Sequence, residues 1–273
     1  MPRPTDPVRP SDGSGPANWA ELAWPDLGTA LAADAAGEHV GLVPVGAVEQ
    51  HGPHLPTGTD TIVATALCER VAAATGALVL PPIALGVSYG HGTVLPGTLS
   101  LTPDLLVGIV HTYVRWAAFS GLRRLLFVNS HLGNTAALGV ATDTIRLTAP
   151  QLRVGIVDWW AVDSEVTAEV TEDGTDIHAN AAETSIMLAV APQLVRIDRI
   201  GDADDVDRTD ELVFRYTAPA LSRNGVTGRP SQATATAGRR LVDRVVAAIA
   251  GRVERGRIEQ PPLGPAPVPT FPF

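Results

Sequence analysis

Short apolar runs rich in branched residues alternate with longer stretches of helical periodicity over the first 160 or so residues of the chain. Four runs have the length and composition of buried strands, at 39–47, 77–84, 123–130 and 153–160. The intervening pattern predicts helices at 61–76, 102–121 and 134–149. In the second helix, Thr102 suits the N-cap, Pro103 the first helical position and Gly121 the exit. This alternation predicts a parallel or mixed sheet with helices on both faces.

Two further helices are predicted beyond residue 160. A helix is expected over AAETSIMLAVA, at 181–191, and a long C-terminal helix at about 231–256. With 273 residues and 45% hydrophobic content, the chain suits one large domain, which we place at 18–258. Residues 1–17 are polar and Pro-rich and are expected to form a disordered arm, and residues 259–273 a Pro-rich extended tail.

Composition excludes several classes of function. The net charge of -9 and the absence of a basic run argue against nucleic acid or a membrane as partner, which leaves a small molecule or a peptide. Cys68 is the only cysteine, so a disulfide framework is excluded and a cytoplasmic location is expected. The twenty basic residues are all arginines, and the lack of lysine excludes Schiff-base chemistry and a Walker-type phosphate loop.

Polar clusters follow the predicted strands at the point where each ends. EQHGPH follows the strand at 39–47, SYGHG follows that at 77–84, and NSHLGN follows that at 123–130. A fourth cluster, at 176–180, leads into the helix that carries Glu183. Because ligands of such sheets bind beyond the carboxyl ends of the strands, we expect these clusters to form one site.

The segment EQHGPHLPTGTD has the composition of half a metal site. Glu49, His51 and Asp60 offer oxygen and imidazole ligands that suit Zn²⁺, Mn²⁺ or Fe²⁺. Alternation places Glu49 and His51 on the same side of an extended segment, and the intervening Gly and Pro residues allow Asp60 to return. The alternative is a solvated loop in which Asp60 caps the next helix. His131 at a second strand end, with His178 and Glu183 beyond it, favours the metal site.

Four motifs together resemble the creatininase (creatinine amidohydrolase) family. They are VPVGAVEQHGPHLPTGTD, LPGTLSL at 95–101, VNSHLGN at 128–134 and HANAAETSIML at 178–188, and the likeness runs from about residue 19 to the C-terminal helix. The resemblance implies a three-layer α/β/α sandwich with a mostly parallel central sheet. It also implies a centre of two divalent metal ions, Zn²⁺ or Mn²⁺ with Fe²⁺ as an option, and hydrolysis of a C–N amide bond. Family members assemble as homo-oligomers, often hexamers.

Carried over by position, the resemblance implies two metal-binding groups that share Asp60. One ion would be held by Glu49, Asp60 and His131, and the other by His51, Asp60 and one further carboxylate. True creatininase supplies that carboxylate two residues after the strand-end histidine, where this chain has Gly133. Glu183 is the candidate replacement, and the alternative is that it contacts a ligand and not the ion.

The resemblance also assigns residues around the metals. True creatininase encloses its flat substrate between two tryptophans; Trp160 matches one of them, but Gly174 stands in place of the other, which implies a substrate other than creatinine. His178 and Glu183 are the candidate catalytic residues, with His178 transferring a proton to the leaving nitrogen. His91, Trp160 and Asn134 are candidates for substrate binding, although His91 could be a surface residue and Asn134 a helix cap.

The sequence therefore predicts a metal-dependent amidohydrolase that hydrolyses a small cyclic or linear amide with a metal-bound hydroxide. Two alternatives stay open. One is a peptidase-like family member that trims a modified peptide, as in mycofactocin maturation. The other is a non-catalytic protein that binds a metal or a small ligand.

Overall fold

The computed structural model of the chain describes residues 18–34 and 37–264. The expected N-terminal arm, 1–17, and residues 265–273 of the expected tail lie outside the described residues. Within the described part, no helix is long and apolar enough to cross a membrane.

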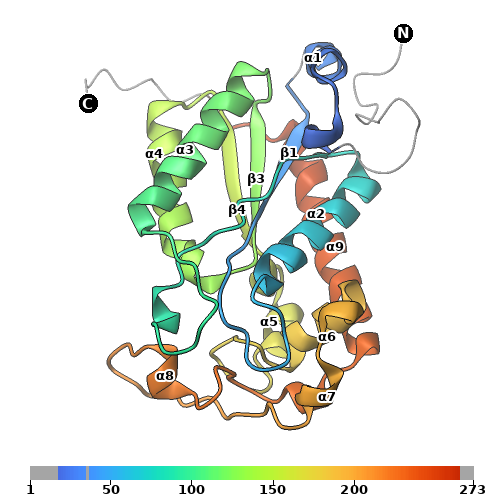
Figure 1. Ribbon diagram of the computed structural model, residues 1–273. Coiled ribbons are helices and arrows are strands. Elements are labelled where there is room, and N and C mark those ends of the chain that lie inside the picture. The colour runs from blue at the N-terminus through green and yellow to red at the C-terminus, as the bar shows by residue number, and fades with distance from the viewer. Residues whose placement is uncertain (1–17, 35–36, 265–273) are drawn as a thin grey trace.

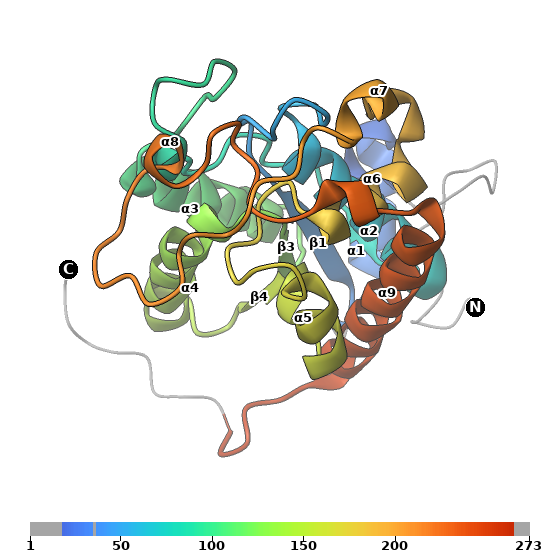
Figure 2. The same ribbon diagram turned by 90° about the horizontal axis from the view of Figure 1, so that it is seen from below.

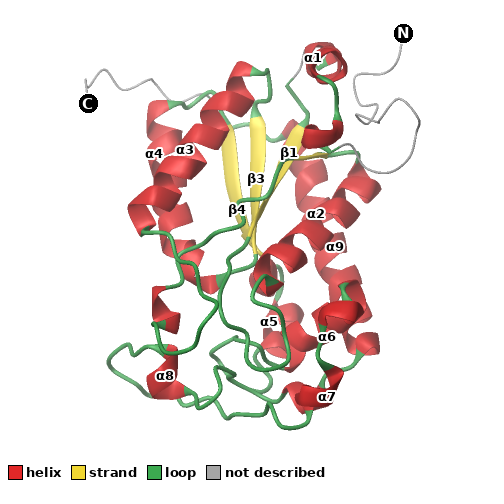
Figure 3. Cartoon of the chain, in the orientation of Figure 1, coloured by secondary structure: helices red, strands yellow, loops and turns green. Residues whose placement is uncertain are grey.

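A four-stranded parallel sheet forms the centre of the molecule (Figure 3). Its strands lie in the order β2 (Leu78–Val79), β1 (Val40–Val45), β3 (Arg124–Asn129) and β4 (Arg153–Asp158). All three strand pairs are parallel, with Val45 opposite Asn129 and Asn129 opposite Asp158 at the carboxyl end. Every residue of β1 is buried, which explains why its sequence is an almost unbroken apolar run.

Helices cover both faces of this sheet, and the predicted three-layer α/β/α fold is confirmed (Figure 1). On one face, α3 (Pro103–Phe119) and α4 (Thr135–Thr148) enclose a core that includes Leu106, Phe127 and Leu138. On the other, α2 (Thr59–Thr75) and α9 (Ala235–Ile258) enclose a core that includes Leu42, Leu67 and Leu241. Leu42 and its neighbour Val43 point into different cores, as alternation along a strand requires.

The shorter helices and most of the long loops lie near the ends of the strands. These helices are α1 (Trp24–Ala33), α5 (Ser164–Val170), α6 (Ala181–Val190), α7 (Ile197–Ile200) and α8 (Ala218–Leu221). Seen from below, the segment that carries α8 runs across the carboxyl end of the sheet (Figure 2). This is the end at which the sequence predicted a site.

The element boundaries differ from the prediction where proline or a capping side chain decides them. Strand β2 is short because Pro81 and Pro82 lack the N–H that a continued ladder needs, although Ile83 N still donates to Pro44 O at 2.9 Å. Helix α9 begins at Ala235 and not near 231, because the Thr234 side chain accepts a hydrogen bond from Ala237 N. Thr102 caps α3 as predicted, with Leu105 N as its donor.

Candidate metal centre

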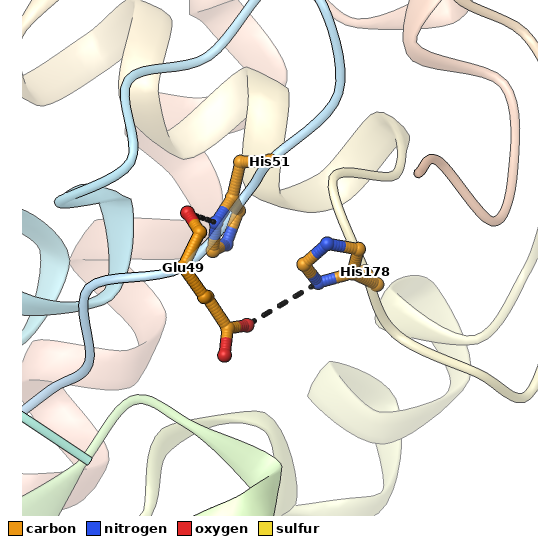
Figure 4. Close-up of side chains that lie close together, drawn as sticks. All are labelled: Glu49, His51 and His178. Carbon is orange, nitrogen blue, oxygen red and sulfur yellow. Dashed lines mark hydrogen bonds and ion pairs between the residues drawn. The ribbon is translucent and has the colours of Figure 1, made fainter. Parts of the chain in front are cut away.

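Glu49 and His51 leave the end of β1 on the same side of an extended segment and point into the same space (Figure 4). The segment is held by the hydrogen bond from Glu49 N to Thr57 O, 2.9 Å, and it turns at Gly52, whose φ is 63°. The ring of His51 donates from Nδ1 to its neighbour's main-chain oxygen, Glu49 O, at 3.3 Å. This bond leaves Nε2 of His51 directed away from the main chain.

Asp60 reaches that nitrogen from the first turn of α2. Its Oδ1 lies 3.2 Å from His51 Nε2, and its Oδ2 lies 3.4 Å from His131 Nδ1. The helix begins at Thr59 after Gly58, so Asp60 is not its N-cap, and the alternative that it merely caps the helix does not apply. A carboxylate in the first turn is nonetheless favoured by the helix dipole.

His131 completes the cluster from the end of β3. Its Nε2 lies 3.3 Å from Glu49 Oε2 and 2.9 Å from the carbonyl oxygen of Val87, which accepts its proton. Glu49 and Asp60 thus face opposite nitrogens of the same imidazole.

Glu183 reaches the cluster from the first turn of α6. Asn180 caps this helix by accepting from Glu183 N at 3.1 Å, and Glu183 Oε2 accepts from Ala179 N at 2.5 Å. Ala179 adopts a left-handed conformation with φ 52°, which is uncommon for a residue other than glycine. The turn thereby directs both Glu183 and the preceding His178 towards the cluster.

Three overlapping groups of these side chains bring ligand atoms within 4.8 Å of one another. The groups are Glu49, Asp60 and His131; His51, Asp60 and Glu183; and Glu49, His51 and His178. Glu49 Oε2, His51 Nε2 and Asp60 Oδ2 are buried and have no hydrogen-bond partner among the described residues. Buried polar atoms without partners are costly, so a bound cation is the kind of group that this donor set fits.

The electrostatics of the cluster are dominated by burial and by the carboxylates. Burial lowers the pKa of His51, but Asp60, Glu183 and Glu49 outweigh it and raise that pKa to about 10. Burial likewise opposes protonation of His131, yet Glu49 and Asp60 raise its pKa to about 9. The pKa of Glu183 rises to about 7, first through burial and then through Asp60, against the opposing charge of His51. The carboxylates therefore create a strong negative field that favours cations.

A cavity of about 380 Å³ opens above the cluster. Its floor includes Glu49, Asp60, His131 and Glu183, and its wall includes His178, Trp160 and His91. His91 Nε2 lies 3.0 Å from Glu49 Oε1, and His178 Nδ1 lies 3.6 Å from the same oxygen. The far side is formed by residues of 209–221, which we call the roof.

Comparison with known proteins agrees with this geometry. The family model for creatininase (creatinine amidohydrolase) matches residues 20–253. The chain belongs to the creatininase family.

A mycofactocin precursor peptide peptidase from Mycobacterium ulcerans is 36% identical over 78% of this chain and 84% of its own length. A creatinine amidohydrolase from Pseudomonas putida is 32% identical over 89% of this chain and 96% of its own. The solved structure titled Creatininase Mn has a TM-score of 0.75 and 29% identity, covering 89% of this chain and all of that one.

The chain is thus a creatininase-family hydrolase with a His, Glu and Asp cluster suited to metal. The two positions at which this chain departs from the expected creatininase pattern, Gly133 and Gly174, lie where a larger side chain would not fit. A Cβ at Gly133 would collide with the carbonyl oxygen of Val87 and lie 2.5 Å from His131 Nε2, so the loop has no room for a carboxylate there. A Cβ at Gly174 would lie 2.7 Å from Asp207 Cβ, so Asp207 fills space that a tryptophan would need.

Asn134 is placed differently from the other candidates for substrate binding. It is fully buried and is not among the residues that line the cavity. Its Nδ2 donates to Gly46 O at 3.0 Å, and its Oδ1 accepts from Val87 N at 2.9 Å. It makes no capping bond to α4 either, so the side chain serves to join the loops that follow β1 and β3 to the His91 loop. Trp160 lines the cavity, whereas its neighbour Trp159 is buried and donates to Ser130 Oγ.

Several residues of the site were missed from sequence. They are Gln50 beneath the two cavity histidines and, in the lining, Phe214, Arg215 and Tyr216. Gln50 stands between Glu49 and His51, and a polar residue enclosed by two candidate ligands was a signal that could have been used. The roof residues lie in a segment without helical or strand periodicity, which left no signal for their position.

Proposed function

We propose that the chain is a metal-dependent amidohydrolase that cleaves the C–N bond of a small cyclic or linear amide. The observation that carries this proposal is the pair of buried ligand groups that share Asp60 at the floor of the cavity. Glu49, Asp60 and His131 would hold one divalent ion, and His51, Asp60 and Glu183 the other. The donor set suits Zn²⁺ or Mn²⁺, and Fe²⁺ is also compatible with it.

When bound, two such ions would lower the pKa of a water to about 7 and would polarise the scissile carbonyl. The protein's own residues supply position and proton transfer. Trp160 offers a flat apolar surface in the cavity wall, against which a planar amide can lie. His178 lies between the floor and the wall, with Nδ1 directed towards Glu49 (Figure 4), and it is placed to move a proton to the leaving nitrogen.

The proposal is tested with protein reconstituted with Zn²⁺ or Mn²⁺ and screened against amides, lactams, formamides and short peptides. His178→Ala serves as the control variant and should lose about 10²- to 10⁴-fold in kcat while it retains metal, since this is the typical contribution of a positioned acid or base. Full activity of His178→Ala on the best substrate would contradict its role. Failure of the fully metallated protein to hydrolyse any of these compounds would favour a non-catalytic binding protein.

A second candidate is a peptidase that removes residues from a short peptide. Two observations favour it: the 36% identity to a mycofactocin precursor peptide peptidase, and the presence of Arg215 in the cavity lining. The lining residues otherwise carry charge only on carboxylates and imidazoles, so this guanidinium is suited to a peptide carboxylate. Cleavage of a peptide with a free C-terminus, and not of its C-terminal amide, would select this candidate over the first.

We also propose that the chain forms a homo-oligomer, with a hexamer as the expected state, and acts in the cytoplasm. Trp116 and Phe119 on α3 support self-association, because they are 64% and 72% exposed and their rings contact each other edge to face. Light scattering during size-exclusion chromatography measures the mass of the assembly, and a monomer at micromolar concentration would contradict this proposal.

A further inference from the structure

Gln50 occupies the space beneath the two histidines of the cavity wall. It is 5% exposed, and its side-chain nitrogen lies 3.1 Å from His91 Nδ1, 2.8 Å from His178 Nε2 and 3.1 Å from Gly225 O. Its side-chain oxygen accepts from Gly52 N at 3.0 Å. A Cβ at Gly225 would overlap Gln50 Oε1, so the loop at 225 closes directly on this amide.

The orientation of the Gln50 amide is fixed by two main-chain groups. The N–H of Gly52 is only a donor, so the atom that it meets must be the amide oxygen. The carbonyl of Gly225 is only an acceptor, so it must face the NH₂ group. These two contacts together exclude the flipped amide.

The main-chain oxygen of Gln50 favours one tautomer of His178, and the orientation of the amide is compatible with it. Its Nε2 lies 2.8 Å from the main-chain oxygen of Gln50 and 2.8 Å from the side-chain nitrogen. If Nε2 carries the proton and donates to Gln50 O, the two protons of the amide serve Gly225 O and His91 Nδ1, and only the contact between Nε2 and the amide nitrogen has no shared proton. If Nε2 instead accepts from the amide, Gln50 O loses this donor, and the two amide protons must serve three acceptors.

We propose that Gln50 is a positioning residue that gives the two cavity histidines opposite roles. Its main-chain carbonyl holds the proton of His178 on Nε2, so the Nδ1 lone pair of His178 faces the cavity and Glu49. Its side-chain amide holds Nδ1 of His91 as an acceptor, so the Nε2–H of His91 donates to Glu49 Oε1 at 3.0 Å. One histidine thus accepts and the other donates at the same carboxylate.

The assignment has a consequence for catalysis that rests on the proposed function. With a lone pair on Nδ1, His178 must take up a proton from the attacking water before it can give one to the leaving nitrogen. His91 instead holds Glu49 by a hydrogen bond, as the neighbours of metal-binding carboxylates commonly do. For His91 to become the acceptor and His178 the donor at Glu49, the hydrogen bonds of Gln50 would have to rearrange.

The test is the tautomeric state of both histidines, measured by two-bond ¹⁵N–¹H NMR correlation on the Zn²⁺-loaded protein with ¹⁵N-labelled histidine. The expected spectrum of the unmodified protein shows both His91 and His178 protonated on Nε2. In Gln50→Met, His91 should lose its single tautomer, whereas His178 should keep its own because its partner is the main-chain oxygen of residue 50. Zn²⁺ affinity should fall about 10- to 100-fold, as for other partners of metal-bound side chains.

Asn224→Ala is the matched control. Asn224 lies next to Gly225 and donates to Ala203 O at 2.9 Å, so its loss removes a hydrogen bond of the same loop but none of the contacts of the Gln50 amide. Both tautomers should be unchanged in this variant. A spectrum of the unmodified protein with His91 or His178 protonated on Nδ1 alone would overturn the proposal, even if Gln50→Met did not fold. An unchanged His91 in folded Gln50→Met would also overturn it. Absence of amide hydrolysis would count against the proposed function and leave these tautomers unaffected.

Discussion

The floor and the roof of the cavity are built in opposite ways. The floor consists of Glu49, Asp60, His131 and Glu183, which are between 1% and 6% exposed and stand at strand ends or in the first turns of helices. The roof, 209–221, exposes Leu212, Phe214 and Tyr216 by 45%, 73% and 50%. The buried floor holds the candidate metal ligands in closely packed positions, whereas the exposed roof is less constrained by packing.

The largest effect is expected at Asp60, because both metal-binding groups share it. Asp60→Asn should weaken binding of both ions by more than about 100-fold, since loss of a mere partner of a ligand typically costs about 10- to 100-fold. Isothermal titration with Zn²⁺ measures the affinity. Asp143→Asn, a change at a carboxylate that is 66% exposed on α4, is the control and should bind as the unmodified protein does. Two intact sites in Asp60→Asn would remove the distinction between floor and roof.

A pair of glycines tests how closely the floor is packed. Gly133→Ala should destabilise the fold by about 1–3 kcal/mol, the usual cost of overpacking, because its Cβ meets Val87 O and His131. Gly139→Ala, with nothing within 4 Å of its Cβ in helix α4, should instead stabilise by up to about 1 kcal/mol through helix propensity. Urea denaturation distinguishes the two signs. Equal stability of the two variants would show that the loop at 133 is not tightly closed.

The strand-end residues and the roof also show what the sequence could and could not predict. Strands followed by Glu49, His51 and His131 were predicted because local periodicity and strand-end chemistry are written in consecutive residues. Gln50 acts through His91, His178 and Gly225, which are 41, 128 and 175 residues away, so its partners are set by tertiary packing. The roof lacks periodicity, and its Glu211 adopts a positive φ of 58° without a glycine to indicate it.

The base of the roof is clamped by Asp205. This carboxylate pairs with Arg208 on one side of the roof and accepts from Arg223 N, 2.7 Å, and Ser222 Oγ, 3.1 Å, on the other. Burial works against ionisation, but these hydrogen bonds outweigh it and lower the pKa of Asp205 to about 2. Asp205→Asn should therefore raise hydrogen exchange across 205–228 and raise KM, with metal content unchanged.

The pH dependence of this clamp follows from the same shift. Because the folded pKa, about 2, lies below the ordinary value of 3.8, the clamp stabilises the roof fully above the ordinary value and is lost as the pH falls towards 2. Hydrogen exchange of the roof amides, relative to the intrinsic rate at each pH, should rise as the pH falls over that range in the unmodified protein. It should stay flat in Asp205→Asn. A parallel rise in both proteins would assign the change to another group.

The smallest effect is expected at Arg215 in the roof. Arg215→Gln should raise KM about fivefold for a substrate with a carboxylate, since an exposed ion pair contributes up to about 1 kcal/mol. For a neutral amide, KM should not change. Steady-state kinetics on a peptide and on its C-terminal amide give both values. An equal rise for the two substrates would show that Arg215 shapes the roof and does not recognise charge.

We propose that Glu183 completes a second metal site in place of the carboxylate that Gly133 cannot supply. Metal content per chain, measured by mass spectrometry after reconstitution and dialysis, is the decisive test. We expect about two ions in the unmodified protein and about one in Glu183→Gln, because the group of Glu49, Asp60 and His131 is left intact. Two retained ions in Glu183→Gln, or a single ion in the unmodified protein, would contradict it.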